Sequence, residues 1–421
     1  MDNVTHTLIG VLVGEAAAVL TKPSRDGLPQ ATRRALCVTT MAIGSNLPDL
    51  DFLYSTVTGS KLDYLLHHRG HTHTFVVAIF IAAAMWLAFE LWAKRRNQPI
   101  SRTDRMTLAA LALLAPMLHI AMDLTNNYGV HPLWPFDNRW FFGDSIFIVE
   151  PLLWAAIAPT LFFLRTRIAR AICALILAIG IGLAFGSGMV PMPFAIAYSI
   201  FVARLLYAGW KLHARAAVML GLSVWVFVSL VFITTSRIAE RRVDMLAHAH
   251  FPAAYILDRV LTPMPVNPIC WEVIFIQQEA ADLVLRRAML SMMPTWIPAA
   301  RCPGRSLDIP ITAPLHRVAA IDSASLKWHG EVRSSSKLLS SLWNENCRVD
   351  AFMRFARAPW LAHLERRWVI GDLRYDREEA LGFAEIEVEA HAEPCPAWVP
   401  PWVPPRRDVR APLSVGDQVM E

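Results

Sequence analysis

Histidine and aspartate residues gather in four short motifs of this chain, and each motif lies inside or at the edge of an apolar segment. The motifs are "MDNVTHT" (1–7), "GSNLPDLDF" (44–52), "LLHHRGHTHTF" (65–75) and "MLHIAMD" (117–123). An ionisable side chain at the centre of an apolar span costs roughly 2.5–3.5 kcal/mol on insertion scales, so such residues are expected to serve a function. Imidazole nitrogens with carboxylate oxygens suit borderline divalent ions. The motifs therefore predict a metal site.

The spacing inside the motifs selects the candidate ligands. Asp2 and His6 are four residues apart, as are His119 and Asp123, so each pair would share one face of a helix. Asp2 has two interpretations, as the N-cap of the first helix or as the residue that orients His6. The predicted metal ligands are His6, Asp49, His68, His73, His119 and Asp123.

Other polar residues receive catalytic or supporting roles. Asp51 and Arg69 are the predicted catalytic residues. Arg69 is chosen because arginine can hold a phosphate group bidentately. His67 is interpreted as a polar residue at the membrane edge. The further candidates, as supporting or additional ligands, are Asp2, His71, Asp144 and Glu150.

The donor set predicts hydrolytic chemistry. It is large enough for one to three divalent ions, with zinc the first choice and manganese or iron next. Paired ions stabilise the attacking and leaving oxygens of a displacement and supply hydroxide near neutral pH. We therefore expect hydrolysis of a phosphoester or of a lipid-like substrate.

Composition indicates a membrane protein. The chain has 421 residues, of which 55% are hydrophobic and only 18% charged, and its mean hydropathy is +0.37. Soluble proteins average about a quarter charged residues. The expected partners are membrane lipids and a small or lipid-like substrate. The modest net charge of +5 does not argue for nucleic acid, and the oligomeric state stays open. Eight spans are predicted, at about 4–20, 35–47, 74–93, 106–125, 146–164, 168–188, 192–210 and 216–235.

The loops between these spans alternate in charge. Those after the first, third, fifth and seventh spans hold fourteen Lys and Arg residues, whereas those after the second, fourth and sixth hold three. Basic loops stay in the cytoplasm. This rule predicts that both termini and all four motifs lie on the periplasmic face of a bacterial inner membrane. The count uses only Lys and Arg, so the histidines and acidic residues of the motifs did not influence it.

After the last span the composition changes. Residues 1–236 are the predicted transmembrane domain, and 237–395 have the alternating pattern of a soluble α+β domain, for example in "WVIGDLRYD" and "FAEIEVEA". A proline-rich tail is expected over 396–421. The predicted fold is a mostly α membrane bundle with a C-terminal α+β domain. Two disulfides in any of three pairings, or four free thiols, are equally compatible with Cys270, Cys302, Cys347 and Cys395.

The four motifs resemble the YdjM-like inner-membrane proteins, a family described as metal-dependent hydrolases. "DNVTHTLIG", "LPDLD", "HHRGHTHT" and "HIAMD" are similar to it in order and spacing over residues 1–155, and "GDSIFIVEPL" resembles its next segment. Where relatives often have an aspartate before the proline, this chain has Glu150. The resemblance implies functional positions at Asp2, His6, Asp49, Asp51, His68, Arg69, Gly70, Thr72, His73, His119 and Asp123.

"HIAMD" is also similar to an element of zinc-dependent phospholipase C and P1-type nucleases, in which a His-x-x-x-Asp pair helps to bind a zinc cluster. Their later His-x-x-x-Glu pair has no counterpart in this sequence.

Two other functions compete with hydrolysis. In a transporter, the same histidines and aspartates would relay protons or bind a transported ion. That alternative predicts ionisable residues through the later spans, whereas those found here gather at one face. In a catalytically inactive scaffold, the C-terminal domain would be the working part, but it carries no cofactor or nucleophile motif.

Overall fold

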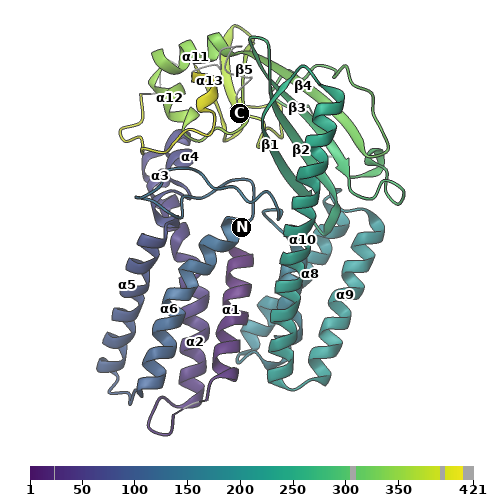
Figure 1. Ribbon diagram of the computed structural model, residues 1–421. Coiled ribbons are helices and arrows are strands. Elements are labelled where there is room, and N and C mark those ends of the chain that lie inside the picture. Colours follow the sequence, from purple (N-terminus) through teal and green to yellow (C-terminus); the bar gives the residue numbers. More distant parts are fainter. Residues whose placement is uncertain (23, 304–309, 389–393, 411–421) are drawn as a thin grey trace.

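The protein is described by a computed structural model that covers residues 1–22, 24–303, 310–388 and 394–410. Apolar helices form one half of the molecule, and two antiparallel sheets with short helices form the other (Figure 1). Helix α10 (Ala214–His250) runs from the first half into the second. The predicted combination of a helical membrane bundle and a C-terminal α+β domain is confirmed.

Six described helices are long and apolar enough to cross a membrane, judged by length and composition. Only 6% of the apolar window of α5 is buried inside the protein, and apolar surface of this extent is stable against lipid rather than water. The protein is therefore a membrane protein. The six helices are α1 (Asn3–Leu20), α5 (Phe75–Arg95), α6 (Arg102–Asp123), α8 (Arg167–Gly186), α9 (Met192–Lys211) and α10.

Eight spans were predicted, and the remaining two coincide with shorter elements. The span expected at 35–47 lies in α2 (Gln30–Gly44), which has 15 residues and carries Arg33 and Arg34 near its start. These charges shorten its apolar part. In Figure 1, α2 nevertheless runs alongside α1 and α6 within the bundle.

The span expected at 146–164 is interrupted by proline. An irregular segment leads into α7 (Pro151–Trp154), which continues as the 3₁₀ helix η3 (Ala155–Phe163). Pro151 and Pro159 lack the backbone N–H that an α-helix uses, so the long helix predicted from hydropathy does not form.

Local sequence features fix the helices that carry the motifs. Asp2 caps α1 by accepting a hydrogen bond from the Thr5 N–H at 2.9 Å. Gly14 of α1 lies so close to α2 that a Cβ there would be 2.6 Å from the Val38 Cα. Small residues permit such close helix packing in membranes. Thr74 likewise caps α5, at the end of the histidine-rich motif.

Short elements connect α2 to α5 at the end of the bundle where the N-terminus lies (Figure 1). Gly59 follows the last residue of the helix 52–58 and has a left-handed backbone, with φ of +67°. Arg69 also has a left-handed backbone, with φ of +59°, in the turn between the helix 61–67 and the segment 71–73. The basic connections after α1, α5, η3 and α9 lie at the opposite end. The elements are η1 (Leu47–Asp51), α3 (Phe52–Thr58), α4 (Lys61–His67) and η2 (His71–His73).

The C-terminal domain contains two antiparallel sheets, and the motifs "WVIGDLRYD" and "FAEIEVEA" contribute strands as predicted. The first sheet has the order β1 (Tyr255–Met264), β2 (Asn267–Glu279), β3 (Asp282–Ser291), β4 (Leu326–Ser335). The second has the order β5 (Pro359–Leu364), β6 (Arg367–Asp372), β7 (Glu385–Glu387). The short helices are η4 (Ala299–Arg301), α11 (Ser336–Glu345), α12 (Cys347–Met353) and α13 (Arg407–Arg410).

The four cysteines of this domain form two disulfides, Cys270–Cys302 and Cys347–Cys395, which settles the pairing that the sequence left open. The second disulfide includes Cys395, near the start of an extended, proline-rich segment that we call the strap (residues 394–406). Trp402 of the strap is fully buried, and its indole N–H donates to the Leu66 carbonyl oxygen at 2.8 Å. Of the predicted tail, residues 411–421 lie outside the described residues.

The two halves of the molecule share a hydrophobic core. Leu65 and Leu66 of α4 and Tyr128 after α6 pack with buried residues of the C-terminal domain such as Trp360. Helix α10 also belongs to both halves, because its first part packs in the bundle whereas Ala239, Val243 and Ala247 contact the first sheet. The C-terminal domain therefore covers the end of the bundle at which the motifs lie.

Candidate metal centre

Four side chains from three elements converge at this end of the bundle. Asp49 comes from η1, His73 from η2, and His119 and Asp123 from α6. The Nε2 atoms of His73 and His119 are 3.0 Å apart. Asp49 Oδ1 lies 3.3 and 3.5 Å from them, and Asp123 Oδ2 lies 3.2 and 3.4 Å from them. All four residues are buried. We call these four residues the cluster.

The donor atoms of the cluster fit a divalent ion. Ligands about 2.0–2.2 Å from a tetrahedral zinc ion lie about 3.3–3.6 Å from one another, close to the separations seen here. His119 Nδ1 is 2.7 Å from the Ser45 carbonyl oxygen, which can only accept, so Nε2 presents its lone pair to the cluster. Such a hydrogen bond is typical of metal-binding histidines. Within the described residues, Asp123 Oδ2 accepts no hydrogen bond of good geometry.

Asp51 lies beside the cluster, and its carboxylate contacts the imidazole rings of two histidines. Its carboxylate is 3.0 Å from His68 Nδ1 and 3.3 Å from His73 Nδ1. It also accepts hydrogen bonds from the Arg69 backbone N–H at 2.9 Å and the Thr72 hydroxyl at 2.8 Å. These contacts orient both imidazole rings, as carboxylates commonly do around metal-binding histidines.

Asp49, Asp51 and His68 form a second group of three donor atoms that lie within 4.8 Å of one another. Asp49 belongs to both groups, so its carboxylate can bridge two ions. Asp51 therefore has two compatible roles, as a ligand or as an orienting residue.

The carboxylates in and beside the cluster favour a positive charge among its donor atoms. Burial alone raises the pKa of the Asp49 and Asp51 carboxyls, but hydrogen bonds from the neighbouring histidines outweigh it and lower both pKa values well below the usual range. Burial opposes a charge on His73, yet the carboxylates of Asp123, Asp49 and Asp51 raise its pKa to about 10. A metal cation would supply positive charge in place of that proton.

His6 and Arg69 approach Asp123 from other directions. His6 Nε2 is 3.1 Å from Asp123 Oδ1, and its ring stacks on His119 with centroids 3.8 Å apart. Arg69 Nε is 3.1 Å from Asp123 Oδ2, and its guanidinium also donates to the Asn126 side chain at 2.9 Å. Because Arg69 is buried, its charge balances Asp123 inside the protein. Asp2 takes the capping role, the first of its two interpretations.

His71 lies outside the cluster, in a cage of aromatic rings. Trp134, Trp398 and Trp402 each have a ring centroid 4.7–4.9 Å from the His71 imidazole. His67 contacts Trp398 in the same way, with centroids 4.7 Å apart. The strap therefore covers the outer face of the histidine-rich motif.

The two supporting carboxylates also lie apart from the cluster. Asp144 pairs with Arg357 of the C-terminal domain at 2.8 Å. Glu150 caps α7 by accepting from the Leu152 N–H at 3.0 Å, and it accepts from the Val266 N–H at 3.1 Å. Both therefore join the membrane half of the molecule to the C-terminal domain.

Sequence reasoning missed several residues that shape the site. The Ser45 carbonyl oxygen fixes the His119 tautomer, Asn126 holds Arg69, and Trp402 covers the motif. A backbone acceptor leaves no trace in a residue pattern. Trp402 did carry a signal, since a large aromatic residue in a proline-rich tail is expected to be anchored somewhere.

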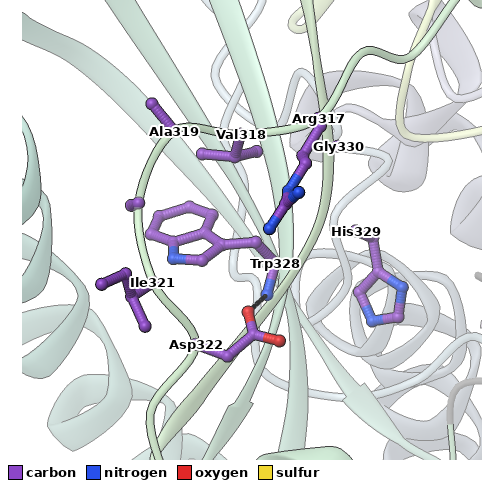
Figure 2. A pocket seen from close by; sticks show the side chains of 9 residues that line it. Arg317, Val318, Ala319, Ile321, Asp322, Trp328, His329 and Gly330 are labelled. Carbon is purple, nitrogen blue, oxygen red and sulfur yellow. Dashed lines mark hydrogen bonds between the residues drawn. The ribbon is translucent and has the colours of Figure 1, made fainter.

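A cavity of about 540 Å³ lies in the C-terminal domain, and none of the residues that line it belongs to the cluster. Figure 2 shows the Trp328 ring facing the loop 317–322, where the Asp322 carboxylate accepts from the Trp328 backbone N–H at 2.9 Å. Arg317 and His329 also line the cavity (Figure 2). The polar residues that line this cavity come from one loop and one strand, whereas the residues of the cluster come from three separate elements.

Residues 1–191 match the model of a family described as YdjM inner membrane protein. The Bacillus subtilis (strain 168) protein named "Uncharacterized protein YfhP" is 28% identical over 157 residues, which cover 36% of this chain and 43% of that relative. The chain thus spans less than half of the relative's length. No solved structure matches the chain. The segment that is similar to the YdjM inner membrane proteins, residues 1–191, contains all four residues of the cluster.

Proposed function

We propose that this protein is a membrane-bound, metal-dependent hydrolase that acts on a phosphoester or lipid-like substrate at the periplasmic face of a bacterial inner membrane. The observation that supports it most is the convergence of four buried donor atoms, with the lone pair of His119 Nε2 directed at them. The similarity of residues 1–191 to an inner-membrane family supports the proposed location.

The cluster would hold one divalent ion, with zinc preferred for a mixed imidazole and carboxylate set. Asp49, Asp51 and His68 would hold a second. Bound ions of this kind act as Lewis acids and make hydroxide available near neutral pH.

The other residues position these groups. Arg69 balances the charge of Asp123, and Asp51 orients His68 and His73. His68, with 14% of its side chain exposed, faces the side from which substrate can approach. During hydrolysis a water oxygen bonds to phosphorus, the bond to the ester oxygen breaks, and a proton from the water passes to the leaving alcohol.

Metal analysis of detergent-purified protein tests the proposal. We expect wild type to retain about one or two equivalents of zinc or manganese, as these donor groups suggest. The double variant His119→Ala, Asp123→Ala should lose them. Asp137→Asn, which alters an exposed pair with Arg139 in the loop after α6, is the matched control and should keep wild-type metal. Equal, substoichiometric metal in all three proteins would overturn the metal site.

A phosphoesterase assay tests the reaction. Hydrolysis of bis(p-nitrophenyl) phosphate should require added zinc or manganese, stop with a chelator, and be absent from the double variant. Stoichiometric metal without hydrolysis in a broad phosphoester and lipid screen would contradict the hydrolase and favour the transporter.

A separate experiment tests on which side of the membrane the C-terminal domain lies. Alkaline phosphatase fused after His250, the end of α10, should be active because it folds only in the periplasm. An inactive fusion would place the C-terminal domain and the cluster in the cytoplasm.

A further inference from the structure

Apolar side chains are exposed directly beside the candidate metal centre. Every residue of α3 is exposed or half-buried. Val57 is 86% exposed, and Leu50, Phe52 and Leu53 are also exposed large hydrophobic residues. This run begins between Asp49 and Asp51, so the candidate ligands and the apolar surface share one short segment.

The surface of α3 continues onto a membrane helix. Asp51, at the start of α3, accepts a hydrogen bond from Thr72, three residues before α5 begins. The first turns of α5 expose Phe75, Ile79 and Phe80. Figure 1 shows α3 above the upper end of α5 at the same edge of the molecule. Because α5 is a candidate span with an exposed apolar surface, lipid is the medium that covers both helices.

The candidate centre opens toward this edge. His73, His119 and Asp123 have no exposed side-chain surface, whereas Asp51 and His68 retain some. The Tyr64 ring stacks on His68 with centroids 4.8 Å apart. Substrate therefore approaches from the side of α3 and α4.

A cavity of about 330 Å³ lies on that approach and is lined by Lys61, Tyr64 and Phe383. Phe383 belongs to the C-terminal domain, and its ring meets Tyr64 edge-on at 6.2 Å. The Lys61 ammonium donates to the carbonyl oxygens of Leu381 and Gly382 at 3.2 and 2.9 Å, which fixes a positive charge at the rim. The site thus combines a cation, two aromatic rings and a lipid-facing helix.

We propose that α3 lies in the interface of the lipid leaflet next to the cluster and that the substrate is a phosphate-bearing lipid of that leaflet. Its phosphate group lies near His68 and Lys61, and its chain follows Tyr64, Phe383 and the exposed face of α3. The C-terminal domain contributes Phe383 to the entrance. The substrate assignment rests on the proposed hydrolase function, whereas the membrane contact of α3 does not.

Spin labelling tests the membrane contact alone. The variant Val57→Cys carries a nitroxide in nanodiscs of phosphatidylethanolamine and phosphatidylglycerol, and Ile321→Cys is the control because Ile321 is an equally exposed aliphatic residue, at 83%, in the C-terminal domain. The label at position 57 should meet oxygen more often than a water-soluble nickel chelate, and the label at 321 the reverse. Unsubstituted protein gives the background from Cys37 and Cys173. Equal chelate access at both positions would overturn the contact.

Kinetics test the substrate class. We compare dioleoyl phosphatidic acid in detergent micelles with glycerol 3-phosphate, which has the same phosphate ester without the chains. For Phe383→Ala and for Leu53→Asp, Val57→Asp, the ratio of lipid to glycerol phosphate activity should fall about tenfold, as expected when one apolar contact is lost. Ile321→Asp should leave the ratio unchanged.

The outcomes separate the two proposals. A ratio that does not change in the α3 and Phe383 variants overturns the lipid substrate while the hydrolase stands. Activity on neither phosphoester, with no bound metal, overturns the hydrolase, and the spin-label result then decides the membrane contact by itself.

Discussion

Asp51 accepts hydrogen bonds from several groups at once, and this makes it the residue whose replacement is most informative. Asp51→Asn keeps the size of the side chain but removes its charge and one acceptor oxygen. His68 and His73 then lose their orientation, and metal affinity should fall roughly 10–100-fold. Competition with a zinc chelator measures this. Asp137→Asn is the control, and an Asp51→Asn affinity equal to that of wild type would show that Asp51 neither binds nor orients.

The carboxyl group of Glu385 should make the stability of the C-terminal domain depend on pH. Burial, and then the neighbouring Asp376 carboxylate, raise the pKa of Glu385 to about 7. The folded state therefore keeps a proton that the unfolded chain loses above about pH 4.5. Its stabilising effect, roughly 1–3 kcal/mol, is complete below that pH and is lost as the pH rises through 7.

Thermal unfolding between pH 5 and pH 8 checks this prediction. The Tm of the C-terminal domain should fall over that range, and Glu385→Gln, which stays neutral, should flatten the fall. A wild-type Tm that rises from pH 5 to pH 8 would contradict the assignment.

Some of the site residues could be predicted because their chemistry is local. His119 and Asp123 are one helical turn apart, and their side chains do meet, at 3.4 Å. Arg69 was predicted to contact substrate from its position in a short outer loop. Its left-handed backbone turns the side chain inward to Asp123, a partner 54 residues away that the local pattern does not reveal.

At the scale of elements, charge predicted more than hydropathy did. The alternation of basic loops predicted which connections share an end of the bundle, and the helices follow it. Hydropathy alone predicted one long helix over 146–164, because it ignores the prolines in the segment 151–163. The strap could not be placed from sequence, since its contacts reach the distant α4.

The strap yields a prediction about one residue with a structural role. Trp402→Ala should destabilise the protein by about 3–5 kcal/mol, because it removes a fully buried ring and its hydrogen bond to Leu66. Trp398→Ala, a change to an exposed residue of the same segment, should cost less than about 1 kcal/mol. Urea unfolding in detergent measures both. Similar losses for the two variants would mean that the strap packs differently.

At the scale of the whole molecule, Arg357 links the two halves. Its guanidinium pairs with Asp144 of the membrane domain at 2.8 Å and with Asp258 of β1 at 2.9 Å. Arg357→Ala leaves two partly buried carboxylates without this cation, which should cost roughly 2–4 kcal/mol. Hydrogen exchange should show faster opening of residues 140–146, whereas the exposed pair variant Arg139→Ala should leave that loop unchanged. Unaltered exchange in Arg357→Ala would show that apolar packing alone joins the domains.

The overall division into bundle and sheet domain could be predicted, because composition changes sharply along the chain. How the domains meet could not. Glu150 and Asp144 were interpreted as spare ligands of the metal site, since a carboxylate near other carboxylates looks alike whether it binds an ion or an arginine. Only the fold reveals that their partners belong to the sheet domain.

The buried Trp402 also has a consequence for biosynthesis. Trp402 and its acceptor Leu66 are 336 residues apart, so the ribosome makes the histidine-rich motif long before its cover. At about 5–20 residues per second, the interval is roughly 17–70 s. Oxidation of Cys347 and Cys395 then anchors the strap. The outer face of the histidine-rich motif is thus uncovered during translation, and the strap covers it only after synthesis is complete.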